Sequence, residues 1–150
     1  MTASAPATTP VNVSVTRRLP ASAERVFDAW LTPESARQWL FATPGGQMVR
    51  AEIEPRIGGE FCLVDRRGGV DVAHVGLWLD LTRPTQLVFS FGVPAVSGTF
   101  TPVTVDIAPL PDGCEITLLH EGVPAELADR TQAGWAATLE RLETTFFAVK

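Results

Sequence analysis

Alternating hydrophobic and polar positions near the start of the chain give way to a helical spacing. In "VNVSVTRRL", residues 11–19, valines alternate with polar side chains, which predicts a half-buried strand. The apolar residues of "SAERVFDAWL", residues 22–31, share one helical face, and Ser22 is a favourable N-cap. A second short helix is predicted directly afterwards, because Thr32 can cap it and Pro33 suits the first helical position.

From residue 47 onwards the hydrophobic pattern returns to a period of two and predicts six consecutive strands. In the first of these strands, Val49, Ala51 and Ile53 share one face, opposite charged side chains. Turn residues separate the strands, among them the hairpin signal "PDG" at residues 111–113. The predicted strands occupy residues 47–55, 60–67, 70–81, 86–92, 101–109 and 114–122.

The strand over residues 70–81 leaves two interpretations open. One phase of its alternation is aliphatic from Ala73 to Leu81, and His74 and Trp78 belong to the other phase. A simple alternation predicts that the aliphatic face is buried and that His74 and Trp78 are exposed, yet an exposed tryptophan is unusual on a strand. Either a bulge shifts the phase or both faces of the strand are covered. In both cases we interpret His74 as a structural residue.

A long amphipathic helix is predicted at the end of the chain, from about Ala125 to Ala148, with Pro124 just before it. In "GWAATLERLETTF", the tryptophan, the two leucines and the phenylalanine recur at spacings that define one helical face. Gly134 interrupts this helix at a cost of about 1 kcal/mol relative to alanine. Because the apolar spacing continues beyond it, Gly134 either follows a short leading segment or lets the helix approach a strand closely.

The order of these elements predicts the fold class. One strand, two short helices, six turn-linked strands and one long helix indicate an antiparallel sheet with a helix covering one face. We therefore predict one α+β domain over residues 11–150. Residues 1–10 are rich in Ala, Thr, Ser and Pro without periodicity, which predicts a disordered tail.

Composition narrows the class of protein further. The 150-residue chain is 45% hydrophobic, enough for a core that needs neither a disulfide nor a metal. Its net charge of −5 argues against a nucleic-acid partner. The isolated Cys62 and Cys114 fit a reducing compartment, and neither a secretory signal nor a membrane-spanning stretch is evident, so we expect a cytoplasmic protein. The spacing of the two histidines indicates no metal site.

Five segments together resemble a known superfamily over residues 11 to about 148. They are "PASAERVFDAWLTPESARQWL", "IGGEF", "HVGLWLDLTRPTQLVFSF", "CEITLLHEG" and "GWAATLERLE". In this order and at these spacings they are similar to the START-like (SRPBCC) superfamily, and within it to the group related to the activator of Hsp90 ATPase. The resemblance implies a helix-grip fold, in which a seven-stranded curved antiparallel sheet wraps around the C-terminal helix and encloses an apolar cavity.

The aromatic residues are the first candidates for lining such a cavity. The chain has four tryptophans and eight phenylalanines but no tyrosine, an unusually apolar set that could equally fill the core. We expect Gly134 at the rim of the cavity, because the superfamily also has "GW" at this place, and Trp135 over its apolar interior. The predicted lining residues are Trp39, Phe61, Leu63, Trp78, Phe89, Phe91, Leu118, His120, Gly134, Trp135 and Leu139.

His120 is the most informative polar candidate. It alternates in phase with Ile116 and Leu118, so it should face the long helix near the end of a strand. There it could orient a ligand or act as a general acid or base, since its ordinary pKa is about 6.5. The alternative is a rim histidine that is bonded to a neighbouring carbonyl group or to water.

The superfamily includes lipid and hormone carriers, polyketide cyclases and chaperone co-activators, and fold alone does not choose among them. We expect a protein that binds a small hydrophobic ligand between sheet and helix, without a cofactor. A cyclase-like enzyme that uses His120, and an Hsp90-type co-activator, are the alternatives. A homodimer is left open.

Overall fold

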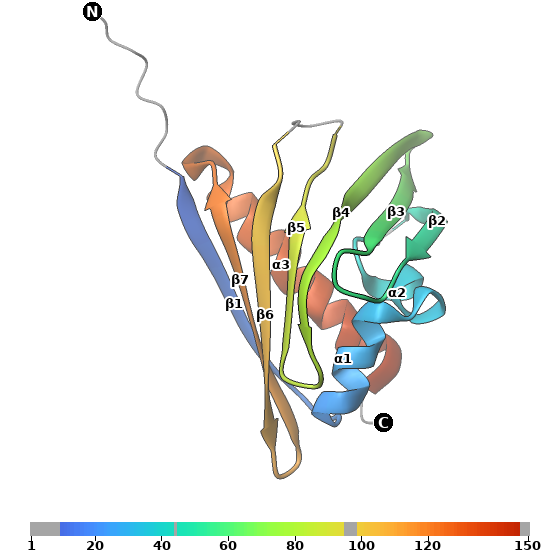
Figure 1. Cartoon of the computed structure of the whole chain (residues 1–150). Coiled ribbons are helices and arrows are strands. Elements are labelled where there is room, and N and C mark those ends of the chain that lie inside the picture. The colour runs from blue at the N-terminus through green and yellow to red at the C-terminus, as the bar shows by residue number, and fades with distance from the viewer. Residues whose placement is uncertain (1–9, 44, 95–98, 148–150) are drawn as a thin grey trace, which may run out of the picture.

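The computed structural model describes residues 10–43, 45–94 and 99–147 (Figure 1). Nine of the ten residues in the predicted tail, and the predicted helix end at Ala148, lie outside these ranges. The strands are β1 (Val11–Leu19), β2 (Gln47–Ile53), β3 (Glu60–Arg67), β4 (Val70–Thr82), β5 (Gln86–Phe91), β6 (Thr101–Leu110) and β7 (Gly113–Val123). The helices are α1 (Ala23–Leu31), α2 (Pro33–Trp39) and α3 (Ala128–Leu142), with a 3₁₀ turn before α3 and a π-helical turn after it.

The described strands form one curved antiparallel sheet in the order β1-β7-β6-β5-β4-β3-β2. β1 pairs with β7 and forms one edge of the sheet, and β2 forms the other edge. The two short helices, which follow β1 and precede β2, therefore connect the two edges. The long helix α3 lies across one face of the sheet, and α1 and α2 pack beside its C-terminal half (Figure 1). This is the α+β architecture that the order of elements predicts.

The beginnings of α1 and α2 follow from their capping residues. The hydroxyl oxygen of Ser22 accepts a hydrogen bond from the backbone N–H of Arg25 at 3.2 Å, as expected of an N-cap. Pro33 occupies the first turn of α2. Thr32 precedes it without capping α2 through its side chain, because its hydroxyl donates instead to the carbonyl of Asp28 at 2.9 Å.

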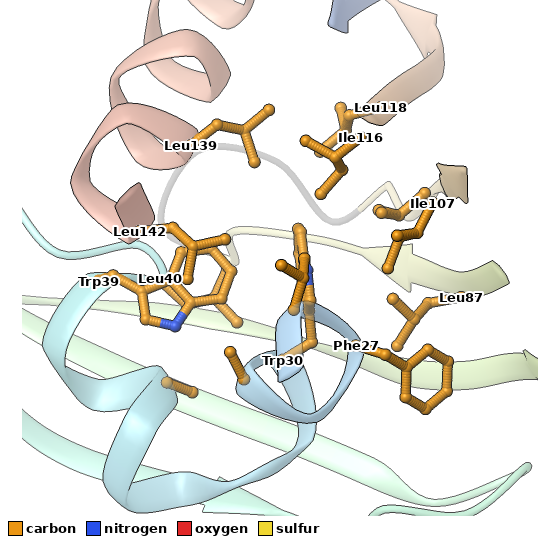
Figure 2. Close-up of a cluster of buried hydrophobic side chains, with 14 of the residues drawn as sticks. Phe27, Trp30, Trp39, Leu40, Leu87, Ile107, Ile116, Leu118, Leu139 and Leu142 are labelled. Atoms are coloured by element: carbon orange, nitrogen blue, oxygen red, sulfur yellow. The ribbon is translucent and has the colours of Figure 1, made fainter. Parts of the chain in front are cut away.

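The core lies between the inner face of the sheet and the three helices (Figure 2). Leu139 and Leu142 of α3 are fully buried: Leu139 points towards Leu118 and Ile116 of β7, and Leu142 lies beside Trp39 and Leu40. Trp30 and Trp39 pack edge to face, with ring centroids 4.8 Å apart. Since each large aromatic side chain buries about 150–250 Å², these rings fill much of the space that the curved sheet encloses.

Strand β4 turns the phase that contains His74 and Trp78 towards the core, whereas a simple alternation predicted that these two residues are exposed. His74 and Trp78 are buried, whereas Leu77 and Leu79 are 40% and 47% exposed. A bulge follows directly: Trp78 pairs with Phe89 and Asp80 with Val88, so Leu79 is an extra residue. Beyond the bulge the phase reverses, and Leu81 packs against the core. Of the two interpretations left open, the bulge is therefore the correct one.

A second bulge corrects the orientation predicted for Val49. The register of β2 against β3 shifts between Met48 and Arg50, which turns Met48 towards the core and leaves Val49 36% exposed. Ala51 and Ile53 do pack against the core. The prediction was therefore wrong for Val49 alone, because a bulge reverses the phase of every residue before it.

Candidate functional site

A pocket of about 280 Å³ opens where the ends of β5, β6 and β7 meet the start of α3. Two of its wall residues, Phe91 and His120, are among the predicted lining residues. None of the lining residues in the described ranges is an aspartate, glutamate, lysine or arginine. The described lining residues are Phe91, Gly92, Val93, Thr99, Thr101, His120, Gly122, Val123, Pro124, Leu127 and Thr131.

His120 is held from both sides at the wall of this pocket. The indole N–H of Trp135, on α3, donates to its Nδ1 at 3.0 Å. Its Nε2 lies 2.7 Å from the hydroxyl oxygen of Thr101, at the start of β6. The hydroxyl of Thr101 donates in turn to the carbonyl of Phe91 at 3.4 Å. The four residues form a hydrogen-bonded chain that joins α3 to three strands, and we call it the His120 chain.

The His120 chain defines the protonation of its histidine. An indole nitrogen can only donate, so the Nδ1 of His120 carries no proton in the neutral ring. The proton is therefore on Nε2, which donates to Thr101. Burial lowers the pKa of His120 to about 4, which favours this neutral form. With both ring nitrogens engaged, His120 has no free nitrogen with which to accept a proton from a ligand.

Trp135 connects the His120 chain to a cluster of aromatic rings. Its centroid lies 5.7 Å from those of Phe41 and Phe91, and 6.4 Å from that of Phe89. Trp135 also differs from the other three tryptophans of the described chain, whose buried indole nitrogens have no protein acceptor. The hydrogen bond to His120 is therefore a specific feature of this end of the core.

The remaining predicted lining residues are not in the wall of this pocket. Eight of them are buried in the hydrophobic core, where they pack against one another: Trp39, Phe61, Leu63, Trp78, Phe89, Leu118, Trp135 and Leu139. Sequence reasoning missed Thr101, Thr131 and the other residues that come from strand ends and loops. For Thr101 a signal existed, because it continues the phase of the inward-facing Val103 and Val105.

Gly134 lies on the exposed side of α3. A methyl group added to its Cα would have no neighbouring atom within 4 Å. Of the two roles left open for Gly134, a close approach of the helix to a strand is therefore excluded. The pattern was misleading because Trp135, next in the chain, does face the interior.

Gly134→Ala is expected to stabilise the protein by about 1 kcal/mol, because alanine is the better helix former and the added methyl group meets open space. Chemical denaturation of the two proteins measures this difference. A substantial loss of stability in the variant would show that Gly134 has a packing role after all.

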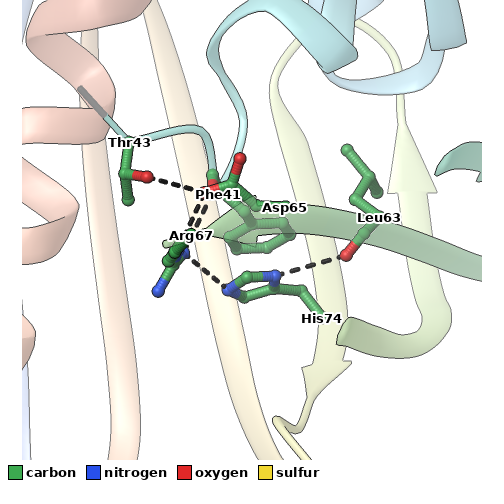
Figure 3. A network of polar contacts seen from close by, with 6 residues as sticks. All are labelled: Phe41, Thr43, Leu63, Asp65, Arg67 and His74. Carbon is green, nitrogen blue, oxygen red and sulfur yellow. Dashed lines mark hydrogen bonds and ion pairs between the residues drawn. The ribbon is translucent and has the colours of Figure 1, made fainter. Parts of the chain in front are cut away.

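A second polar cluster joins the segment after α2 to β3 and β4 (Figure 3). Asp65, whose side chain is 1% exposed, accepts hydrogen bonds through one carboxylate oxygen from Thr43 at 2.7 Å and from Arg67 at 2.8 Å. Arg67 also donates to the carbonyl of Phe41 at 3.2 Å and lies 3.3 Å from Nε2 of His74. We call Thr43, Asp65, Arg67 and His74 the Asp65 cluster.

His74 is neutral and structural in this arrangement. Its Nδ1 lies 3.2 Å from the carbonyl of Leu63, an acceptor, so Nδ1 carries the proton and Nε2 accepts from Arg67. Burial, and to a smaller extent the charge of Arg67, lowers the pKa of His74 to about 4. Its ring stacks on that of Phe41, with ring centroids 4.6 Å apart. Since Phe41 has a positive φ of 61°, uncommon for a non-glycine residue, the cluster holds it in place.

Comparison with known proteins identifies the family. The model of the activator of Hsp90 ATPase homolog 1-like proteins matches residues 20–146, most of the chain. The chain belongs to this family. The match also agrees with the order of strands and helices described above. Proteins with this START-like fold commonly bind hydrophobic ligands.

Solved structures of other bacterial proteins share this fold. A protein from Chromobacterium violaceum is 24% identical, with a TM-score of 0.81 over 89% of this chain and 95% of that one. An AHSA1-like protein from Aeromonas hydrophila is 21% identical, with a TM-score of 0.77 over 89% and 90%. At these identities the likeness shows the fold alone. No curated protein matches the chain.

Membrane-spanning and metal-binding features narrow the class of site in the described residues. They contain no helix long and apolar enough to cross a membrane. In the same ranges, no group of three or more His, Cys, Asp or Glu side chains could hold a metal ion. Glu52 and Glu54 lie on the exposed face of the sheet, where each pairs with an arginine. The pocket beside His120 therefore remains the strongest candidate for a functional site.

Proposed function

We propose that this AHSA1-like protein binds a small, uncharged and mainly apolar molecule in the pocket beside His120. The observation that carries this proposal is the lining itself, which combines apolar side chains with a few hydroxyl groups and has no charged residue among those described. Ligand pockets are typically apolar with a small number of placed polar groups. A carboxylate or phosphate would find no counter-ion among the described lining residues.

The size of the pocket limits the ligand. A protein cavity of roughly 150 Å³ holds benzene, and this pocket has about 280 Å³. A molecule of up to three rings, or a short branched chain, is compatible with that space. The rest of the region between the sheet and α3 is occupied by buried aromatic and aliphatic side chains, which favours a compact ligand over a long lipid.

The geometry supports binding more than acid–base catalysis. A general base needs a free lone pair within reach of the substrate, and both nitrogens of His120 are bonded within the protein. We therefore place His120 in the wall of a binding site. The chaperone co-activator role stays a prediction from the resemblance.

Two chemically matched fluorescent probes test the proposal. Phenylnaphthylamine is uncharged, whereas anilinonaphthalene sulfonate has a similar ring system with an anionic group. We expect the neutral probe to bind in a saturable manner and the anionic probe to bind at least about tenfold more weakly, since its desolvated charge would be unpaired. Equal binding of both probes would contradict the proposed pocket chemistry.

Matched variants on α3 locate the probe. Thr131→Phe places a ring in the pocket and should abolish binding of the neutral probe. Ala133→Phe adds the same ring to the exposed side of the same helix and should leave binding unchanged. Binding that survives Thr131→Phe, or is lost equally in both variants, would place the probe elsewhere.

A further inference from the structure

We infer that the pocket selects ligands with an uncharged oxygen acceptor, such as a ketone, aldehyde or ester carbonyl group, through the hydroxyl of Thr101. This inference rests on the proposed function and specifies the chemical class of the ligand. It is carried by the direction of the hydrogen bonds in the His120 chain together with the position of Thr101 in the pocket wall.

The direction of the His120 chain leaves Thr101 as its terminal donor. The Trp135 indole donates to His120, and the neutral imidazole donates to the oxygen of Thr101 at 2.7 Å. One lone pair of Thr101 is therefore already used, while its hydroxyl proton is available for donation. Accepting a hydrogen bond polarises a hydroxyl group and makes it a stronger donor.

The present acceptor of the Thr101 proton is a poor one. The distance from the hydroxyl oxygen to the Phe91 carbonyl is 3.4 Å, much longer than the roughly 2.7–2.8 Å typical of an O–H···O hydrogen bond. That carbonyl also belongs to β5, which pairs with β6 at this point. A ligand oxygen in the pocket can therefore take over the proton of Thr101 at little cost to the protein.

The rest of the lining favours an uncharged acceptor. No lysine or arginine among the described lining residues offers a charge to an anion. The walls around Thr101 include Phe91, Val123 and Leu127, which suit the hydrocarbon part of a ketone or ester. In this account Thr101 contacts the ligand, and His120 and Trp135 are positioning residues that orient its hydroxyl group.

Acetophenone and ethylbenzene provide a matched pair of probes, because they have the same size and differ by a carbonyl oxygen in place of two hydrogens. The dissociation constant of each is measured by displacement of phenylnaphthylamine. The quantity compared is the ratio of the ethylbenzene constant to the acetophenone constant. We expect Thr101→Val, which keeps the shape and removes the hydroxyl, to lower this ratio about twofold to tenfold, the value of one hydrogen bond.

Control variants separate a specific contact from a general disturbance. Thr101→Ser keeps the hydroxyl and should retain the ratio, and Thr131→Val removes a different pocket hydroxyl and should also retain it. His120→Phe should lower the ratio by disconnecting Thr101, even where the affinity for ethylbenzene is unchanged. A merely structural role would reduce both affinities together and leave their ratio constant.

The outcomes distinguish this inference from the proposed function. If both probes bind and Thr101→Val leaves their ratio unchanged, the role of Thr101 is overturned, while the pocket itself stands. If neither probe displaces phenylnaphthylamine from the wild-type protein, the proposed function fails and the inference fails with it. A ratio that falls in Thr101→Val and is retained in Thr101→Ser supports the assignment.

Discussion

Arg67→Met is expected to lower the free energy of unfolding by about 3–5 kcal/mol, the usual cost of leaving a buried charge without its ion-pair partner. Asp65 is 1% exposed, so its carboxylate would remain in the interior with Thr43 as its only remaining side-chain donor in the described structure. The methionine keeps the length of the arginine stem, so the loss reports the charge and the hydrogen bonds. Urea denaturation at neutral pH measures the change.

The reverse substitution should cost less. Arg67 is 37% exposed, so water can solvate its guanidinium group when Asp65 is replaced. Asp65→Asn is therefore expected to lower stability by about 1.5–3 kcal/mol, in the range of a lost hydrogen bond to a charged group. The double variant should be more stable than Arg67→Met alone. A larger loss for Asp65→Asn than for Arg67→Met would contradict the asymmetry in burial.

Stability is expected to fall as the pH falls from about 6.5 to about 4. Burial lowers the pKa of both His74 and His120 to about 4 in the folded protein, below the ordinary value of 6.5. Between these values the unfolded chain binds protons that the folded protein does not, so acidification favours unfolding. Protonation of each histidine should lower the free energy of unfolding by up to about 3 kcal/mol, and this loss is complete below pH 4.

Denaturation at several pH values tests this dependence. His74→Gln and His120→Gln each remove one titrating group and should each reduce the slope of stability against pH by roughly half. Asp28 and Asp71, whose pKa values are lowered by Arg83 and Arg66, lose their contribution only as the pH falls below about 3.8, so they act below this window. A slope unchanged in both variants would rule out the histidines as its source.

The fold could be predicted from sequence because local signals agree with its tertiary structure. Ser22 caps α1 as the pattern indicates, and "PDG" joins β6 to β7. The bulges at Val49 and Leu79 could not be placed, since a bulge adds one residue without changing the composition of a strand. In β4, the burial of the large Trp78 and His74 rings determines which face of the strand points inward.

The candidate site was predictable only in part. The phase of β7 correctly turns His120 inward, yet its partner Trp135 comes from α3, and the curvature of the sheet determines that they meet. Asp65 gave an unused signal, because it continues the inward phase of Phe61 and Leu63. A charged residue in a core phase indicates a buried partner, which here is Arg67.

The central claim is that an uncharged apolar molecule occupies the pocket beside His120. Nitrogen–proton correlation spectra of the protein, recorded during titration with phenylnaphthylamine, test it most directly. We predict saturable shifts of the indole signal of Trp135, assigned by Trp135→Phe, and of the amide signals of Thr101 and Leu127, with little change at Leu77 on the outer face of β4. Shifts confined to Leu77 and its exposed neighbours, or no shifts at saturating probe, would contradict the account.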